Sequence, residues 1–332
     1  MGDDDAAGHR GDDPAVPTDD GPSPEERDVT PPAGEIVADR EAAETAIEED
    51  EVPNPAAGVL DTTEHRPGVP KPDSILVADD IVRSFGGLRA VDVEHVEFQR
   101  GAITALIGPN GAGKTTFFNL LTAFDQPDSG TRRLDGERID GKPPHVLARN
   151  GMVRTFQLTK SLARLNVLEN MKLGAGHQTG ESMLKAFVRP LWSKQEAEIE
   201  AKAVDILEQF RMIHMRDELA GSLSGGQRKL LEMARAMMAD PKIIMLDEPM
   251  AGVNPALTQS LLHHIKRMRA NGITVLFVEH DMDVVRDISD WVVVMAEGQV
   301  IAEGPPETIG RNQAVVDAYL GTQSAALVRE GE

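Results

Sequence analysis

The sequence has 332 residues, 40% of them apolar, which is enough for one large or two modest folded units with a substantial core. It contains no cysteine, which excludes disulfides and thiolate metal sites and is compatible with a reducing compartment. The N-terminus is acidic and lacks an apolar stretch, so we expect no secretory signal. No window of about 18 consecutive apolar residues occurs, so we expect no membrane-spanning helix either.

The net charge of −21 is concentrated near the N-terminus. Residues 1–70 contain 20 acidic side chains and 4 arginines, whereas residues 71–332 contain 35 acidic and 30 basic side chains. The first segment is rich in Pro, Gly and Ala and has no sustained periodicity beyond a weakly helical stretch at residues 41–50. We predict that residues 1–70 form a disordered acidic tail, which either only solvates the protein or serves as a docking or regulatory segment.

The folded part is expected to span residues 74–322, followed by a short C-terminal tail over residues 323–332. Strand-like runs come first, at residues 74–82, 90–99 and 102–107. A helical pattern follows at residues 115–124, and strands and helices then alternate. This order predicts an α/β fold with a largely parallel sheet and a β-rich N-terminal subdomain.

The segment 158–222 contains no convincing strand, and we predict a helical subdomain there. Ser193 and Glu196 have the spacing of a capping box. An apolar stripe with helical spacing follows it, formed by Ile199, Ala203, Ile206, Leu207 and Phe210. A later helix is expected to begin at Asn254 and Pro255, to bury Leu257, Leu261, Ile265 and Met268, and to end at Gly272.

A glycine-rich sequence after the third strand fits the pattern of a phosphate-binding loop. It consists of Gly108, Pro109, Asn110, Gly111, Ala112, Gly113, Lys114 and Thr115, with Thr116 as a further phosphate donor. Glycines let backbone N–H groups turn toward a phosphate, and the start of the following helix adds partial positive charge. Lys114 can reach the β- and γ-phosphates of ATP, and the Thr115 hydroxyl can bind Mg²⁺.

Two adjacent carboxylates, Asp247 and Glu248, end the apolar strand that begins near Lys242. Successive side chains of a strand point to opposite sides. We therefore expect Asp247 to hold Mg²⁺ through water and Glu248 to act as the base that activates the attacking water. Such a pair alone is often a helix cap or a turn, but after a phosphate loop it indicates a hydrolysis site.

The sequence LSGGQ at residues 223–227 opens another helix, so its N–H groups can form a second anion site. Its residues Ser224, Gly225, Gly226 and Gln227, taken in order with the preceding motifs, make the chain resemble the ABC ATPases. In that family this loop contacts the γ-phosphate held by the opposite subunit. The resemblance therefore implies that ATP lies between two subunits in a head-to-tail dimer.

Other positions take their roles from the same resemblance. Phe85 matches the aromatic residue that stacks on adenine. Gln157, in VRTFQ, matches the glutamine that contacts Mg²⁺ and the attacking water, and His280, in FVEHD, matches the histidine that contacts the γ-phosphate. Asn254 stands where many members have an aspartate, so a neutral side chain makes the contact across the dimer.

The strings RSFGGLRAV, DEPMAGVNP, EHDM and the terminal AYLG are similar to the importer ATPases for branched-chain amino acids. Urea and amide importers and lipopolysaccharide exporters share parts of this pattern. The resemblance implies a second ATPase subunit, which is a paralogue or a copy of this chain. It further implies permease subunits, an indirect link to an extracytoplasmic substrate-binding protein, and a place on the inner face of the membrane.

Two other function classes compete with a transporter ATPase. A non-transport ABC ATPase acting on DNA or ribosomes usually carries two cassettes or a long coiled coil, and the net negative charge disfavours a nucleic-acid partner. A scaffold that binds ATP without turnover is disfavoured by the presence of Lys114, Asp247, Glu248 and His280. Phosphate release would distinguish the scaffold from the ATPase.

Overall fold

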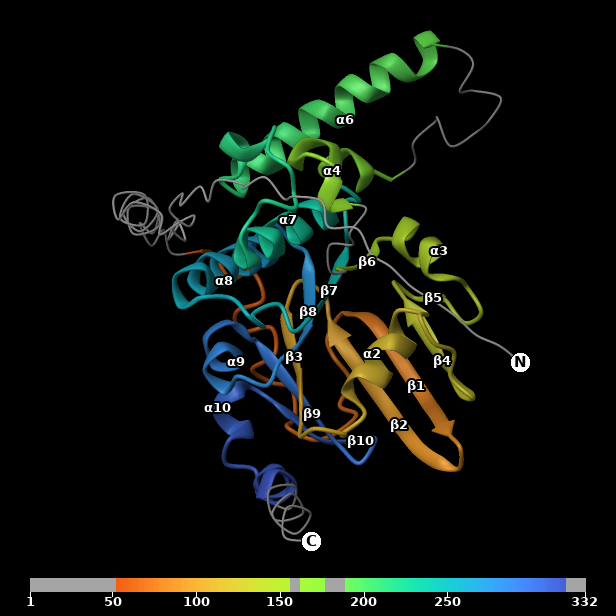
Figure 1. The fold of residues 1–332 in the computed structure, drawn as a ribbon. Helices are drawn as coiled ribbons and strands as arrows, with labels where there is room; N and C mark the ends of the chain where they lie inside the picture. The colour runs from red at the N-terminus through yellow and green to blue at the C-terminus, as the bar shows by residue number, and fades with distance from the viewer. Residues whose placement is uncertain (1–51, 156–161, 177–188, 321–332) are drawn as a thin grey trace, which may run out of the picture. The chain divides into compact units, whose positions relative to one another are not determined.

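A computed structural model describes residues 52–155, 162–176 and 189–320, with side chains of 189–193 excepted. These residues belong to one of the two structural units of the chain, residues 46–332. Two sheets dominate the described part of the chain (Figure 1).

The first sheet is antiparallel and has the strand order β2-β1-β4-β5. Its strands are β1 (Ser74–Phe85), β2 (Leu88–Gln99), β4 (Ser129–Leu134) and β5 (Glu137–Arg138). β1 and β2 form a hairpin in which Phe85 pairs with Leu88 across Gly86 and Gly87, both with positive φ. Glycine is favoured at both positions because a type I′ turn requires that conformation.

The second sheet has the order β10-β9-β3-β8-β7-β6 and is parallel except for the edge strand β10. Its strands are β3 (Ile103–Ile107), β6 (Met152–Arg154), β7 (Ile243–Asp247), β8 (Thr274–Val278), β9 (Trp291–Ala296) and β10 (Gln299–Gly304). β3, β8 and β9 are buried along their whole length. Such continuous apolar strands are typical of a parallel sheet covered on both faces.

Helices connect and cover these strands in the part of the chain that the structure describes. They are α2 (Lys114–Leu121), α3 (Pro144–Arg149), α4 (Val167–Leu173), α6 (Arg189–Gln209), α7 (Gly225–Met237), α8 (Pro255–Ala270), α9 (Met282–Ile288) and α10 (Pro306–Ile309), with a further helical run at residues 313–320. Single 3₁₀ turns lie at Leu162–Arg164 and Ile213–Met215. Among the described residues, no helix is both long enough and apolar enough to cross a lipid bilayer.

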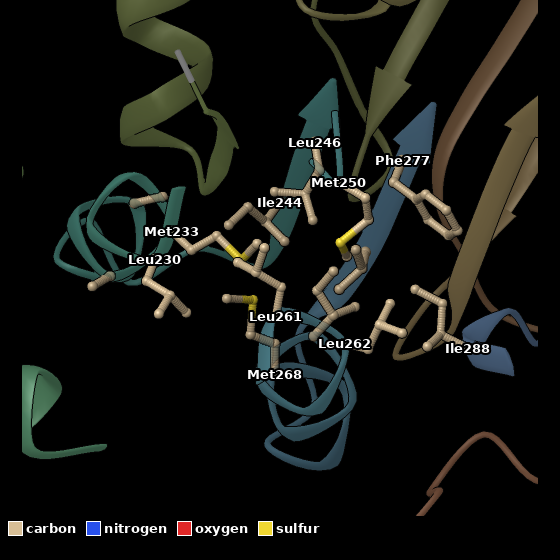
Figure 2. Close-up of a cluster of buried hydrophobic side chains, with 14 of the residues drawn as sticks. Leu230, Met233, Ile244, Leu246, Met250, Leu261, Leu262, Met268, Phe277 and Ile288 are labelled. Atoms are coloured by element: carbon tan, nitrogen blue, oxygen red, sulfur yellow. The ribbon is translucent and has the colours of Figure 1, made fainter. Parts of the chain in front are cut away.

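The parallel sheet has a hydrophobic cluster on each face. On one face, side chains of α7, α8 and α9 pack against β7 and β8, as Figure 2 shows with Leu230, Leu261 and Phe277 among others. On the other face, Phe117 and Phe118 of α2 pack with side chains of the antiparallel sheet. Because side chains pack against both faces, the parallel sheet is a rigid scaffold for the loops at the ends of its strands.

The predicted helix after Asn254 is confirmed, except that one residue of its apolar stripe is only half-buried. The Asn254 side chain accepts a hydrogen bond from Leu257 N, and Pro255 is the first helical residue. Leu257 is half-buried, while Leu261, Ile265 and Met268 are fully buried. Gly272 follows the helix end with φ 80°, a conformation that glycine adopts without strain.

The described part of 158–222 is helical, as predicted, but one detail differs. α6 already begins at Arg189, so Ser193 lies inside the helix and the predicted capping box at its start is wrong. The capping box of this region is instead at α4, where Asn166 and Glu169 bond each other's backbone N–H. Asn166 also forms a β-bridge with Leu219, which holds the two ends of the helical region together.

The predicted tail boundary at residue 70 is wrong, because residues 52–70 are folded. Ala56, Leu60 and Val69 are buried, and the Asn54 amide donates to Asp290 at 2.8 Å. We call residues 52–73 the N-terminal strap. The Pro- and Gly-rich composition of this segment hides its few apolar residues, and Asn54 bonds a residue 236 positions away. Residues 1–51 and the predicted C-terminal tail lie outside the described residues.

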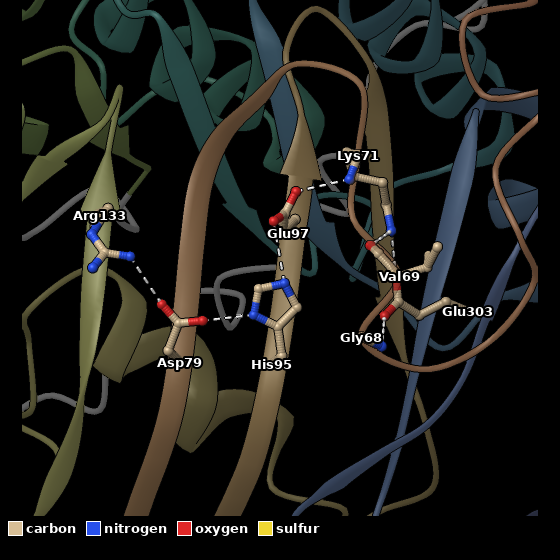
Figure 3. Close-up of polar contacts among 8 residues, drawn as sticks. All are labelled: Gly68, Val69, Lys71, Asp79, His95, Glu97, Arg133 and Glu303. Atoms are coloured by element: carbon tan, nitrogen blue, oxygen red, sulfur yellow. Dashed lines mark hydrogen bonds and ion pairs between the residues drawn. The ribbon is translucent and has the colours of Figure 1, made fainter.

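A buried ion pair fixes the strap to β10 (Figure 3). Lys71 Nζ lies 2.8 Å from Glu303 Oε2, and the two side chains are 1% and 0% exposed. Glu303 also accepts from Gly68 N at 2.7 Å and from Trp291 Nε1 at 3.1 Å. Because an isolated buried charge is costly, Glu303 depends on the strap for its cation.

Candidate active site

The predicted phosphate loop lies between β3 and α2, as the motif requires. Gly108 and Gly113 have φ 150° and 92°. A Cβ on Gly108 would collide with the carbonyl oxygen of Met295, and one on Gly113 with that of Ala90. Glycine is needed here because the backbone of neighbouring strands approaches the loop so closely.

Lys114 points back into this loop. Its Nζ donates to the carbonyl oxygens of Gly108 at 2.7 Å and Pro109 at 2.9 Å. Burial lowers the pKa of Lys114, and the nearby carboxylate of Glu248 partly offsets this shift. The ammonium is thus placed inside the loop, where a phosphate group would be a stronger acceptor than the two carbonyls.

A cavity of about 610 Å³ opens in front of the loop. That is large enough for a nucleotide, since ligand pockets measure about 300–1,000 Å³. Its lining brings together the phosphate loop, the β1–β2 hairpin, the β9–β10 turn and one of the two predicted carboxylates. The lining residues are Leu88, Arg89, Ala90, Asn110, Gly111, Ala112, Gly113, Lys114, Thr115, Thr116, Glu248, Glu297 and Gly298.

The adjacent carboxylates are turned to different surroundings, as expected for neighbours at a strand end. Glu248 lines the cavity. Asp247 ends β7, and its Oδ2 accepts from the Arg154 guanidinium at 2.8 Å. Glu248 has φ 44°, the left-handed region that costs a non-glycine residue about 1–3 kcal/mol. Such strain at a carboxylate facing a cavity is characteristic of functional sites.

Arg154 is a residue of this site that the sequence analysis missed. Besides Asp247, its guanidinium donates to Asn119 Oδ1 at 2.6 Å and lies 5.0 Å from the centre of the Phe118 ring. It ends β6, the neighbour of β7, and therefore connects the end of α2 with Asp247. Its position inside the VRTFQ string, three residues before Gln157, was the available signal.

Two described residues that were assigned by resemblance, His280 and Phe85, do not line the cavity in this single chain. His280 follows β8, with its side chain 69% exposed. Phe85 ends β1 at 49% exposure, and the Arg83 guanidinium lies 4.8 Å from the centre of its ring. Gln157 lies outside the described residues.

The LSGGQ loop forms the start of α7, away from the cavity lining. Ser224 is its exposed N-cap and forms a capping box with Gln227. A Cβ on Gly226 would collide with Leu257 of α8, so this glycine permits close helix packing. Gly225 is exposed, and the nearest atom to a Cβ there would be an oxygen at 3.7 Å. Ser224 and Gly225 thus present a helix N-terminus to the outside, where an anion can approach.

A phosphate loop, a strand-end carboxylate beside it and a second exposed helix N-terminus on this two-sheet scaffold define an ATP-hydrolysing cassette. A family model described as ABC transporter matches residues 92–251, and one described as branched-chain amino acid ATP-binding cassette transporter matches residues 299–325. The chain belongs to the ATP-binding subunits of the ABC transporter family. The predicted family, α/β cassette fold and ATPase class are confirmed.

Individual relatives agree with this assignment. A probable branched-chain amino acid transport ATP-binding protein LivG of Archaeoglobus fulgidus is 44% identical over 253 residues, covering 76% of this chain and 98% of the relative. The high-affinity branched-chain amino acid transport ATP-binding protein BraF of Pseudomonas aeruginosa is 42% identical over 249 residues, covering 74% of this chain and 98% of the relative.

Solved structures share the fold. A nucleotide-free ATP-binding cassette from an ABC transporter has a TM-score of 0.66 at 39% identity, covering 74% of this chain and 98% of that one. The ADP conformation of another such cassette has a TM-score of 0.66 at 40% identity, covering 75% and 99%. Nucleotide binding is thus a property of the family to which the chain belongs.

Proposed function

We propose that this chain hydrolyses ATP at a site completed by a second subunit and thereby energises the import of branched-chain or related amino acids. The proposal of a composite site rests on one observation, which is that the two predicted anion-binding regions are separated within the single chain. Lys114 and Glu248 face one cavity, whereas Ser224 and Gly225 are exposed elsewhere and are not part of its lining. A second subunit in head-to-tail orientation would supply its Ser224 loop to the open side of the cavity.

In this proposal the phosphate loop binds the triphosphate through backbone N–H groups and Lys114. Thr115 and Asp247 offer a hydroxyl and a carboxylate oxygen, hard ligands that fit Mg²⁺, with Gln157 assigned by resemblance. Mg²⁺ would neutralise phosphate charge during hydrolysis. Glu248 orients and deprotonates the attacking water, and His280 contacts the γ-phosphate when the two subunits close. Repulsion between the products then favours reopening.

The cargo and the transport partners are inferred from the relatives, whose names refer to branched-chain amino acid transport. Substrate choice would reside in permease subunits and an extracytoplasmic binding protein, and the chain would act at the inner face of the membrane. The half-buried Leu162 and Leu165 are candidates for an apolar groove that binds a short cytoplasmic helix of the permease. Leu158, the third apolar candidate for this proposed groove beside Gln157, lies outside the described residues, as does Gln157 itself.

A subunit-mixing experiment tests the composite site. Glu248→Gln removes the base but leaves the phosphate loop, so this variant should bind ATP and hydrolyse it at least about 100-fold more slowly. Ser224→Arg should also be inactive, because it blocks the loop offered to the partner's nucleotide. Mixing the two inactive variants creates one intact site per mixed dimer, which pairs Glu248 of one subunit with Ser224 of the other.

We expect steady-state phosphate release to recover in the mixture to a substantial fraction of the unsubstituted rate. The control is the Glu248→Gln variant alone at the same total protein concentration. A fully active Ser224→Arg protein, or a mixture no faster than its components, would show that a single chain encloses the nucleotide. Either result would overturn the composite site.

A further inference from the structure

Glu279 is a buried carboxylate located directly before His280. Its side chain is 1% exposed. Oε1 accepts from the backbone N–H of Met250 at 3.1 Å, and Oε2 accepts from the backbone N–H of His280 at 3.2 Å. One side chain therefore bonds two loops, the one that follows β7 and the one that follows β8.

These two loops carry groups assigned to hydrolysis. β7 and β8 are parallel neighbours, with Asp247 opposite Val278. Glu248 follows Asp247, and Met250 is two residues further along the chain. On the other strand, Glu279 and His280 follow Val278 directly. The bonds of Glu279 thus set the distance between the loop of the base and the loop of the histidine.

The backbone conformation of Glu248 indicates why the two loops are bonded through Glu279. Its φ of 44° is strained for a residue with a side chain, and strain of this kind persists only where surrounding contacts enforce it. The strained residue is held from one side by the bond from Glu248 N to Val278 O at 3.1 Å. The bond from Met250 N to Glu279 holds the loop from the other side.

A residue chosen only for stability would not be a carboxylate here. Burying a charge is unfavourable unless it is paired, and well-packed apolar replacements of buried charges are often as stable or more so. Glu303, another described carboxylate buried to the same extent, has the ammonium of Lys71 at 2.8 Å. Beside Glu279 lies the His280 ring, whose Nδ1 is 3.7 Å from Glu279 Oε2, beyond hydrogen-bond range.

We propose that Glu279 is a positioning residue for ATP hydrolysis, which holds Glu248 and His280 in the relative geometry that hydrolysis requires. The inference rests on the proposed function of Glu248 as the base. A carboxylate suits this role because it is acceptor-only at both oxygens and can accept from two N–H groups at once. An amide in its place offers only one acceptor oxygen and sets its NH₂ group against the second N–H.

The test compares Glu279→Gln with Glu303→Gln in the intact chain. Both remove a negative charge from a carboxylate that is 1% exposed and accepts a backbone N–H, but Glu303 lies in β10. In steady-state ATPase assays, Glu279→Gln should lower kcat by about 10- to 100-fold with the KM for ATP within about threefold, since small misplacements of reacting groups cost about that much. Glu303→Gln should lower the melting temperature and leave kcat unchanged at temperatures where it is folded.

Two further measurements make the result decisive. Because Glu279 sets the geometry of Glu248 relative to His280, adding Glu279→Gln to His280→Ala should lower kcat by less than about threefold beyond His280→Ala alone, and a fully additive loss would overturn the positioning role. Glu279→Asp keeps the carboxylate but shortens the side chain by one methylene, so it should also lower kcat. This variant replaces Glu279→Gln in the test if the glutamine variant does not fold.

The outcomes separate this inference from the proposed function. A Glu279→Gln protein with unchanged kcat, alongside an inactive Glu248→Gln protein, would overturn the positioning role alone. Losses in kcat that follow thermal instability equally in the Glu279 and Glu303 variants would also overturn it. Full turnover by Glu248→Gln would instead overturn the proposed function itself.

Discussion

Replacing Lys71 with methionine tests whether the N-terminal strap is an integral part of the fold. The Lys71 ammonium donates to Glu303 at 2.8 Å and to the carbonyl of Val69 at 3.0 Å, and it lies 4.7 Å from the centre of the Trp291 ring. Burial lowers the pKa of Lys71, and the charge of Glu303 opposes that shift. Methionine retains most of the volume but leaves the Glu303 carboxylate without its cation.

The size of the effect follows from the burial of the pair. Both side chains are at most 1% exposed, so solvent cannot replace the lost ammonium. Removing one partner of such a pair costs about 3–5 kcal/mol in the free energy of unfolding. For a domain of this size, about 2–4 °C per kcal/mol predicts a melting temperature lower by about 6–20 °C. Glu303→Gln added to Lys71→Met removes the stranded charge and should restore most of the loss.

Thermal and urea denaturation of the two single variants and the double variant measure these quantities. ATP hydrolysis at a temperature where all proteins are folded should be unchanged, because Lys71 and Glu303 do not line the cavity. If Lys71→Met melts like the unsubstituted chain and shows no coupling with Glu303→Gln, the strap is not seated on β10 and its inclusion in the fold is wrong.

Two other predictions concern the pH dependence of stability and Asp247, the carboxylate that we propose binds Mg²⁺. Burial, followed by neighbouring positive charges, lowers the pKa of His264 to about 3. Because the unfolded chain binds this proton from about pH 6.5 downward and the native state does not, the free energy of unfolding should fall by about 2 kcal/mol from pH 7.5 to pH 5. His264→Phe keeps a ring stacked on Phe210, where the ring centres are 4.4 Å apart, and should flatten the pH dependence of the free energy of unfolding measured by urea titration. The control His145→Gln, at an exposed position, should leave that pH dependence unchanged. The same pH dependence in both variants would refute the argument. Arg154→Gln should lower kcat at saturating ATP and Mg²⁺ about tenfold with little loss of nucleotide binding, because Asp247 loses its 2.8 Å partner, and an unchanged kcat would contradict this role.

The features that could be predicted from sequence are those set by neighbouring residues. The phosphate loop needs glycine at fixed positions between a strand and a helix, so Gly108 and Gly113 identify it before any contact is known. The helix beginning at Asn254 is defined in the same way by its cap, its proline and its apolar stripe. Asp247 and Glu248 were recognisable because a strand end fixes where its last side chains point.

The features that were missed depend on residues far apart in the chain. Asn54 bonds Asp290, Gly68 bonds Glu303, and Arg154 bonds Asp247, each across a long sequence separation. A strap of Pro- and Gly-rich sequence has no periodicity that would reveal its few buried side chains. The start of α6 was misplaced because Ser193 and Glu196 have the spacing of a cap without being one.

The sequence by itself determined the class of this protein and its nucleotide-binding loop, because both are written in local motifs whose backbone geometry admits few alternatives. The tertiary structure decided where the folded chain begins, which partner Asp247 has, and that Glu279 joins the loops of Glu248 and His280. The physical reason is that a buried polar side chain is stabilised by whichever donors and acceptors the fold brings to it, and sequence spacing carries no record of those partners.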